Sequence, residues 1–266
     1  MGELRHFRSA ALAVAFAAAF GGLLAAQRTY RGMPMPPPEM PLAEPVDGER
    51  AAEFAFARLV YRDLYDGQLL EERPWHIDSP AAERHFLQGI KRLSNVDARP
   101  MEVYVKATDD EIFDYPWLYV VEPGHWDLSD EEVERLREYL LRGGFMVLDD
   151  FHGSAEWASF MDSMQRIFPD RPVREIGPDD EVFHVLFDVE PDEQIPGIQM
   201  LYSGRTFERD GETPHWRGIY DDEGRLMVLI NWNMDLGDAW EHADWPDYTA
   251  KAYRMGINYV VYAMTH

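Results

Sequence analysis

The stretch SDEEVERLREYLLRGGFMVLDDFHG, residues 129–153, contains a helix, a turn and a buried strand in direct succession. Ser129 and Glu132 have the spacing of a capping box, in which each side chain accepts a backbone N–H at the start of a helix. Val133 and Leu136 then begin an apolar stripe on a helix that is otherwise charged. The sequence therefore predicts an amphipathic helix with a defined start.

This helix is expected to end at Gly143 and Gly144, because glycine readily adopts the left-handed backbone conformation that closes a helix. Residues 145–148 are all apolar, which is typical of a strand covered on both faces of a parallel sheet. Polar residues follow at once, beginning with Asp149. Ligands of open α/β folds bind at the carboxyl ends of such strands, so this unit also locates a candidate site.

Alternating strand and helix patterns surround this unit. Strands are predicted at residues 54–61, 102–106, 117–121, 182–189, 217–220 and 226–230, and helices at 79–93, 155–168 and 248–264. Such alternation favours a mostly parallel sheet with helices on both faces. A short turn joins the last two strands, which indicates an antiparallel hairpin at one edge. The predicted architecture is a three-layer, flavodoxin-like α/β sandwich.

The first 48 residues are expected to lie outside the folded domain. Residues 1–26 join basic residues to an apolar, alanine-rich run, as in a secretory signal peptide; an uncleaved anchor in the inner membrane is the alternative. Residues 27–48 are rich in proline and are typical of an extended spacer. Residues 49–266 then form a single α/β domain. Both interpretations of the N-terminus predict export to the periplasm or the exterior.

Composition excludes several classes of function. With 25 basic and 49 acidic residues the net charge is −24, so nucleic acid, which requires a basic surface, is not an expected partner. The chain contains no cysteine, which excludes disulfides, thiolate metal sites, cysteine nucleophiles and a lipid-modified N-terminal cysteine. Membrane contact is expected only through an uncleaved N-terminus.

Polar clusters follow four of the predicted strands. Because the carboxyl ends of parallel strands lie along one edge of a sheet, these clusters are expected to face a common crevice. The candidate ligand-binding residues are Arg62, His125, Asn233 and Asp235, and the candidate catalytic residues are Asp149, Asp150 and His152. Arg62 would supply a counter-charge to the carboxylates.

The group Asp149, Asp150 and His152 supports two interpretations. It has the composition of a general acid/base pair or of a divalent-cation site. Alternatively, Asp150 caps the following helix and Asp149 accepts backbone N–H groups. A divalent cation is the cofactor that the pattern suggests, but no metal-ligand set is assigned, because His125 and His242 lack partners at a zinc-motif spacing.

Five stretches together resemble a bacterial family known as domain of unknown function 4159. They lie at residues 56–61, 115–119, 140–150, 233–237 and 254–263. The resemblance implies a fold similar to class I glutamine amidotransferase-like domains, whose cysteine nucleophile is absent from this chain. Some relatives carry the domain on membrane-anchored proteins beside MoxR-type ATPase and von Willebrand-type modules, which implies a partner complex in the cell envelope.

Three functions remain open at this level. The leading hypothesis is an exported domain, without amidotransferase chemistry, that binds a ligand or partner at the strand-end crevice. The first alternative is a cation-dependent or acid/base hydrolase that acts on envelope glycans or peptides. The second alternative is a structural scaffold of the envelope. The sequence therefore leaves open whether the protein is an enzyme.

Overall fold

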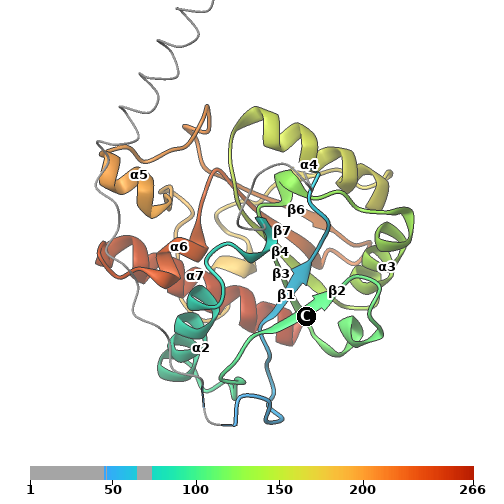
Figure 1. Cartoon of the computed structure of the whole chain (residues 1–266), viewed down its shortest axis with the longest axis horizontal. Helices are drawn as coiled ribbons and strands as arrows, with labels where there is room; N and C mark the ends of the chain where they lie inside the picture. Colours follow the sequence, from blue (N-terminus) through green and yellow to red (C-terminus); the bar gives the residue numbers. More distant parts are fainter. Residues whose placement is uncertain (1–44, 46, 65–73) are drawn as a thin grey trace, which may run out of the picture. The chain divides into compact units, whose positions relative to one another are not determined.

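A mixed sheet of seven strands organises the part of the chain that the computed structural model describes, which comprises residues 45, 47–64 and 74–266. The strands are β1 (Ala57–Val60), β2 (Val103–Lys106), β3 (Trp117–Val121), β4 (Phe145–Phe151), β5 (Arg174–Glu175), β6 (His215–Tyr220) and β7 (Leu226–Trp232). Their order in the sheet is β2-β1-β3-β4-β7-β6-β5 (Figure 1).

The five strands from β2 to β7 are parallel, whereas β6 runs antiparallel to β7, and β5 antiparallel to β6. With β7 counted as the fifth parallel strand, the order is the 2-1-3-4-5 order of flavodoxin-like folds. The predicted α/β fold, with a mostly parallel sheet and an antiparallel hairpin at one edge, is confirmed.

Helices cover both faces of the sheet (Figure 1). They are α2 (Ala81–Leu93), α3 (Asp130–Leu141), α4 (Gly153–Ile167), α5 (Ile198–Ser203), α6 (Leu236–Glu241) and α7 (Pro246–Thr265). Alternate residues of β3 enter two different cores: Trp117 and Tyr119 pack with α2, α6 and α7, while Leu118 and Val120 pack with α3 and α4. Burial on both faces explains why the central strands are continuous apolar runs.

The helix–strand unit of residues 129–153 forms as its sequence predicts. The Ser129 backbone N–H donates to Glu132 at 2.8 Å, and the Glu132 N–H donates to the Ser129 hydroxyl at 3.3 Å. At the other end of α3, Gly143 has a φ of 109° and allows the chain to turn into β4. Every residue of β4 is buried.

The prediction of a strand at residues 182–189 is wrong. This segment contains a short 3-10 helix, Glu181–Phe183, followed by irregular chain. The side chain of Asn258, on α7, accepts the Phe187 N–H at 2.8 Å and donates to the carbonyl groups of Phe183 and Phe187, each at 2.8 Å. Backbone groups that a neighbouring strand would have satisfied are therefore bonded to one buried amide.

The predicted signal or anchor and most of the proline-rich spacer fall on residues 1–44, outside the described residues. Among the residues that are described, no helix has both the length and the hydropathy needed to cross a membrane. The described residues belong to one compact unit.

Candidate functional site

The candidate site lies at the point where the strand order reverses, between the parallel strands β1 and β3. From β1 the chain goes outward to β2 and then returns to the other side of β1 as β3, so the connections after β1 and β3 diverge. Such a switch point leaves a crevice at the carboxyl ends of the two strands. The Tyr61 hydroxyl fastens these ends together, because it donates to the carbonyl groups of Val121 and Glu122, each at 2.8 Å.

Beyond the sheet, where β1 and β3 are parallel, the two chain segments pair again in antiparallel orientation. Asp63 and Trp126 form an isolated antiparallel bridge. The Leu64 N–H donates to the His125 carbonyl at 2.8 Å, and the Asp127 N–H donates to the Arg62 carbonyl, also at 2.8 Å. This short ribbon positions Asp63 beside the ring of His125.

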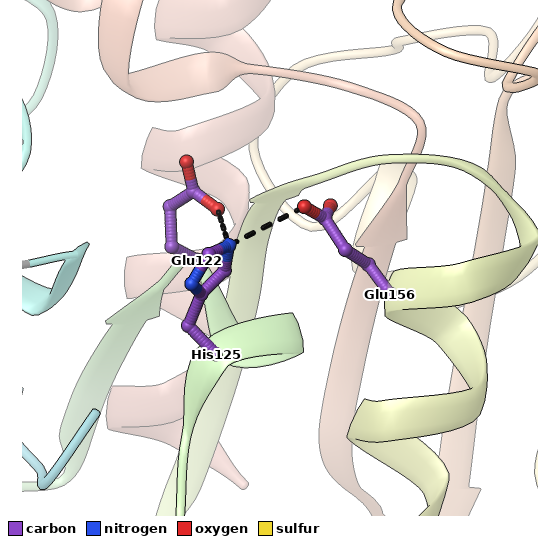
Figure 2. A group of neighbouring side chains, drawn as sticks. All are labelled: Glu122, His125 and Glu156. Atoms are coloured by element: carbon purple, nitrogen blue, oxygen red, sulfur yellow. Dashed lines mark ion pairs between the residues drawn. The ribbon is translucent and has the colours of Figure 1, made fainter. Parts of the chain in front are cut away.

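A histidine and two glutamates converge at this point (Figure 2). Glu122 follows β3, His125 ends the short 3-10 helix Pro123–His125, and Glu156 lies in the first turn of α4. The His125 Nε2 atom is 3.6 Å from a Glu122 carboxylate oxygen and 3.5 Å from a Glu156 carboxylate oxygen. Its other ring nitrogen, Nδ1, is 3.7 Å from the Asp63 carboxylate.

Backbone geometry brings these side chains together. Glu122 has a φ of 51°, in the left-handed region that few residues other than glycine adopt, and it turns the chain sharply out of β3. Gly124 then touches α4, where a Cβ atom would lie 2.6 Å from the Cβ of Glu156. Any larger residue at position 124 would push the glutamate away from the histidine.

Burial and charge set the protonation of this group. Burial, and next the charge of Glu156, raise the pKa of Glu122 to about 7. The hydrogen bond with Glu156 raises the pKa of His125. Burial alone would raise the pKa of Glu156. Hydrogen bonds from His125 and from the His152 N–H have the opposite and larger combined effect, so the pKa of Glu156 is lowered. Both shifts favour a charged Glu156 beside a protonated His125.

These three side chains fit a metal ion. Their ligand atoms all lie within 4.8 Å of one another. Ligand atoms about 2.1 Å from a tetrahedral ion lie about 3.4 Å apart, close to the separations from His125. Metal-binding histidines commonly direct their second ring nitrogen to a carboxylate, which is where Asp63 lies.

Asp149 lies at the same edge of the sheet but is engaged differently. It is fully buried, and one oxygen accepts the Tyr119 hydroxyl at 2.7 Å and the N–H groups of Leu236 and Gly237 at 2.8 and 3.2 Å. Burial raises the pKa of Asp149 to about 6, and these hydrogen bonds oppose the rise. The carboxylate thus joins β4 to the amino end of α6.

Asp150 and His152 form a buried pair beside the histidine–glutamate group. Asp150 has a φ of 54°, and its carboxylate lies 3.2 Å from the His152 Nε2 atom. Burial, and next the charge of Glu122, raise the pKa of Asp150, while burial lowers the pKa of His152 to about 4. The imidazole is therefore neutral at pH 7. The His152 backbone N–H donates to Glu156 at 2.5 Å, which links the two groups.

Asn233 and Asp235 hold local structure at this edge. The Asn233 amide accepts the Gly153 N–H at 2.8 Å and donates to the Thr213 carbonyl at 2.7 Å. Asp235 caps α6 by accepting the Asp238 N–H at 2.8 Å. Asp235 also lies within 4.8 Å of Asp78 and Asp238, measured between carboxylate oxygens.

Arg62 does not belong to the histidine–glutamate group. Its guanidinium pairs with Asp127 at 2.5 Å, and its side chain is 58% exposed. The cation that reaches into the site is instead Arg209, which pairs with Glu156. The sequence predicts none of Glu122, Glu156 and Arg209 as site residues. A glutamate on the first turn of a helix, such as Glu156, usually faces solvent, and nothing in the sequence indicates its burial.

Comparison with known protein families identifies the domain. Residues 55–264 match a family model described as "Domain of unknown function (DUF4159)". The match begins before β1 and ends within α7, so it contains all the strand ends described above. The chain matches no curated protein.

Proposed function

We propose that this chain, which belongs to the DUF4159 family of domains of unknown function, binds a divalent metal ion through Glu122, His125 and Glu156. The observation that carries the proposal is the position of the His125 ring. One ring nitrogen faces two carboxylates at 3.6 and 3.5 Å, and the other faces Asp63 at 3.7 Å.

The ligand set favours a transition metal over calcium or magnesium. Calcium and magnesium prefer oxygen ligands alone, whereas imidazole with carboxylates suits zinc, manganese, iron or cobalt. Three protein ligands leave coordination positions open, as in catalytic rather than structural metal sites. The open positions would be directed into the crevice at the switch point between β1 and β3.

Arg209 is the counter-ion that a metal would replace. Its guanidinium pairs with the Glu156 oxygen that also faces His125. The Arg209 side chain is 50% exposed, so it can move into solvent at small cost. Metal binding would then exchange one cation for another on the same oxygen.

A cation-dependent hydrolase is the second candidate. The observation in its favour is the Asp150–His152 pair, 3.2 Å apart and linked to Glu156 through the His152 backbone. Glu122, His125 and Glu156 would hold the metal ion, which would lower the pKa of a bound water. The Asp150–His152 pair would be the neighbouring group that orients this water, since the neutral imidazole can accept a hydrogen bond. Envelope glycans or peptides are the substrates that the sequence analysis suggests.

The test is a thermal-shift titration of the full chain with zinc, manganese, cobalt, magnesium and calcium. We expect zinc, manganese or cobalt at 100 times the dissociation constant to stabilise the fold by about 2.7 kcal/mol, or roughly 5–10 °C. His125→Ala and Glu156→Gln should abolish the shift. His184→Ala, which alters an exposed histidine paired with Asp188, is the matched control and should retain it.

Two outcomes would refute metal binding at this site. One is a shift of equal size in His125→Ala and in the unaltered protein. The other is the absence of any shift with all five metals at millimolar concentration. Loss of hydrolytic activity without loss of metal binding in His152→Ala would support the second candidate, and retention of both would reject it.

We also propose that the domain acts outside the cytoplasm, in an envelope complex. The support is the sequence pattern of residues 1–26 together with the resemblance described above. Protease accessibility in intact spheroplasts tests the location. Co-purification with a MoxR-type ATPase or a von Willebrand-type protein tests the partner.

A further inference from the structure

A cavity of about 860 Å³ lies between α2, the carboxyl end of α6 and α7. Its wall includes none of the residues of the proposed metal site. The side chains that decide its chemistry are Leu93, Phe187, Trp240, Tyr253, Arg92 and Arg254. This volume is within the range of small-molecule sites, about 300–1,000 Å³.

Close packing fixes the wall of the cavity. The ring of Trp240 stacks on Phe86 at 4.3 Å between centroids, and its carbonyl accepts the Tyr253 hydroxyl at 3.0 Å. Gly89 lies directly beneath the Tyr253 ring, where a Cβ atom would be 2.2 Å from a ring carbon. Glycine in the middle of a helix costs about 1 kcal/mol relative to alanine, and here its small size admits the ring. The cavity is therefore preformed.

Two arginines are placed on this apolar wall. Arg92 lies in the last turn of α2, and Arg254 lies on α7. Within the described residues, neither guanidinium forms an ion pair, although the chain carries a net charge of −24. Leu93, next to Arg92, leaves half of its surface exposed. An apolar cavity with cationic groups on its wall is complementary to a molecule that is apolar at one end and anionic at the other.

We propose that this cavity binds a free long-chain carboxylate. The alkyl chain packs against Leu93, Phe187 and the rings of Trp240 and Tyr253. The carboxylate meets Arg92 and Arg254, since guanidinium groups bind carboxylates with two parallel hydrogen bonds. The wall also contains His85, Gln88, Glu241 and Thr249. A carboxylate with a tail needs only the two arginines for its charged end and the apolar side chains for the rest, whereas a nucleotide or sugar would need polar partners along its whole length.

Calorimetric titration of the full chain with dodecanoate, below its micelle concentration, tests the proposal. We expect dodecanoate to bind at least tenfold more tightly than dodecanol or dodecyltrimethylammonium, which have the same tail without the negative charge. Arg92→Ala/Arg254→Ala should lose at least tenfold in affinity for dodecanoate. Ala250→Phe, which fills the cavity from an exposed position on α7, should abolish binding.

The control variant is Arg135→Ala/Arg142→Ala, which removes the same charge from α3 and its end, across the sheet. It should bind dodecanoate as the unaltered protein does. Equal affinity for dodecanol would overturn the proposal and identify a merely apolar groove. Equal losses in the two double variants would overturn it as well, because the effect would then be one of net charge. His125→Ala should bind dodecanoate normally, so failure of the metal proposal leaves this test intact.

Discussion

Asp149 and Glu156 are both buried carboxylates at the carboxyl edge of the same sheet, but they have different surroundings. One oxygen of Asp149 accepts three hydrogen bonds, from the Tyr119 hydroxyl and from two backbone N–H groups of α6. Glu156 accepts one backbone N–H, and its other oxygen faces the side chains of His125 and Arg209.

The type of hydrogen-bond donor separates a structural carboxylate from a candidate metal ligand. Backbone donors cannot leave without unfolding a helix end, so the oxygen of Asp149 that binds α6 is not available to an exogenous cation. The side-chain cations around Glu156 can move or lose a proton. The contact of Glu122 and His125, after β3, with Glu156 on α4 forms the β3–α4 junction, which can exchange a ligand. The hydrogen bonds from α6 to Asp149 on β4 form the β4–α6 junction, which holds these two elements together.

The largest expected effect is on stability, at the β4–α6 junction. Asp149→Ala leaves a tyrosine hydroxyl and two N–H groups buried without their acceptor, at about 1–3 kcal/mol each, so we expect the free energy of unfolding to fall by about 3–5 kcal/mol. Urea denaturation measures it. Asp162→Ala, on the exposed side of α4, should change stability by less than about 0.5 kcal/mol. A loss below about 1 kcal/mol in Asp149→Ala would remove the distinction between the two junctions.

The second effect is on metal affinity, at the β3–α4 junction. His125→Ala removes the central ligand, and we expect affinity for zinc or manganese to fall at least about 100-fold, because even residues that only orient a ligand contribute 10- to 100-fold. Isothermal titration calorimetry measures the affinity. Asp63→Asn should weaken binding by about tenfold through the orientation of the ring. Unchanged affinity in His125→Ala would show that the metal binds elsewhere.

The pH dependence of metal binding tests the proposed ligands without mutation. Metal binding requires Glu122, with a pKa of about 7, and His125, with a raised pKa, to lose their protons. From pH 6 to pH 8 the ionised fraction of Glu122 alone rises about tenfold, so manganese affinity should rise by at least that factor. Affinity that is constant or falls over this range would contradict the proposed ligands.

Without metal, the ionisation of Glu122 lowers the folding stability as the pH rises, whereas metal affinity increases over the same range. Its pKa in the folded protein, about 7, is above its ordinary value of 4.5, so the folded state holds a proton that the unfolded chain releases. Its contribution to folding stability therefore falls as the pH rises from about 4.5 to 7. Saturating manganese should reduce or reverse this trend in urea denaturation.

The smallest effect is expected from Arg209. Its half-exposed guanidinium competes for Glu156, and an exposed ion pair contributes about 0.2–1 kcal/mol, so Arg209→Ala should raise metal affinity about two- to fivefold. The same titration measures it. Arg205→Ala, which removes a neighbouring arginine stacked on Phe207, is the control and should leave affinity unchanged. Weaker binding in Arg209→Ala would show that Arg209 supports the site and does not compete with the metal.

The fold could be predicted because its determinants are local. The capping box at Ser129, the glycines after α3 and the apolar run of β4 each specify their own conformation, and the alternation of elements leaves few topologies. Residues 182–189 were an exception. Their pattern is that of a strand, but a side chain from residue 258, about 70 residues away, binds their backbone.

The sequence predicts that His125, Asp149, Asp150 and His152 follow buried strands, and the structure places them at that edge of the sheet. It does not predict Glu122 and Glu156 as site residues, because their convergence depends on a left-handed turn and on the contact of Gly124 with α4. Neither the turn nor the contact has a signature in the sequence around it.

Hydrophobic periodicity and glycine stops act over a few residues, so they predict the α/β class, the parallel sheet with its antiparallel edge and the edge at which polar residues gather. Which carboxylates bind backbone and which face a histidine is evident from the three-dimensional structure alone. That choice depends on how α4 and α6 pack against the strand ends, and such packing is a property of the whole sheet rather than of any segment.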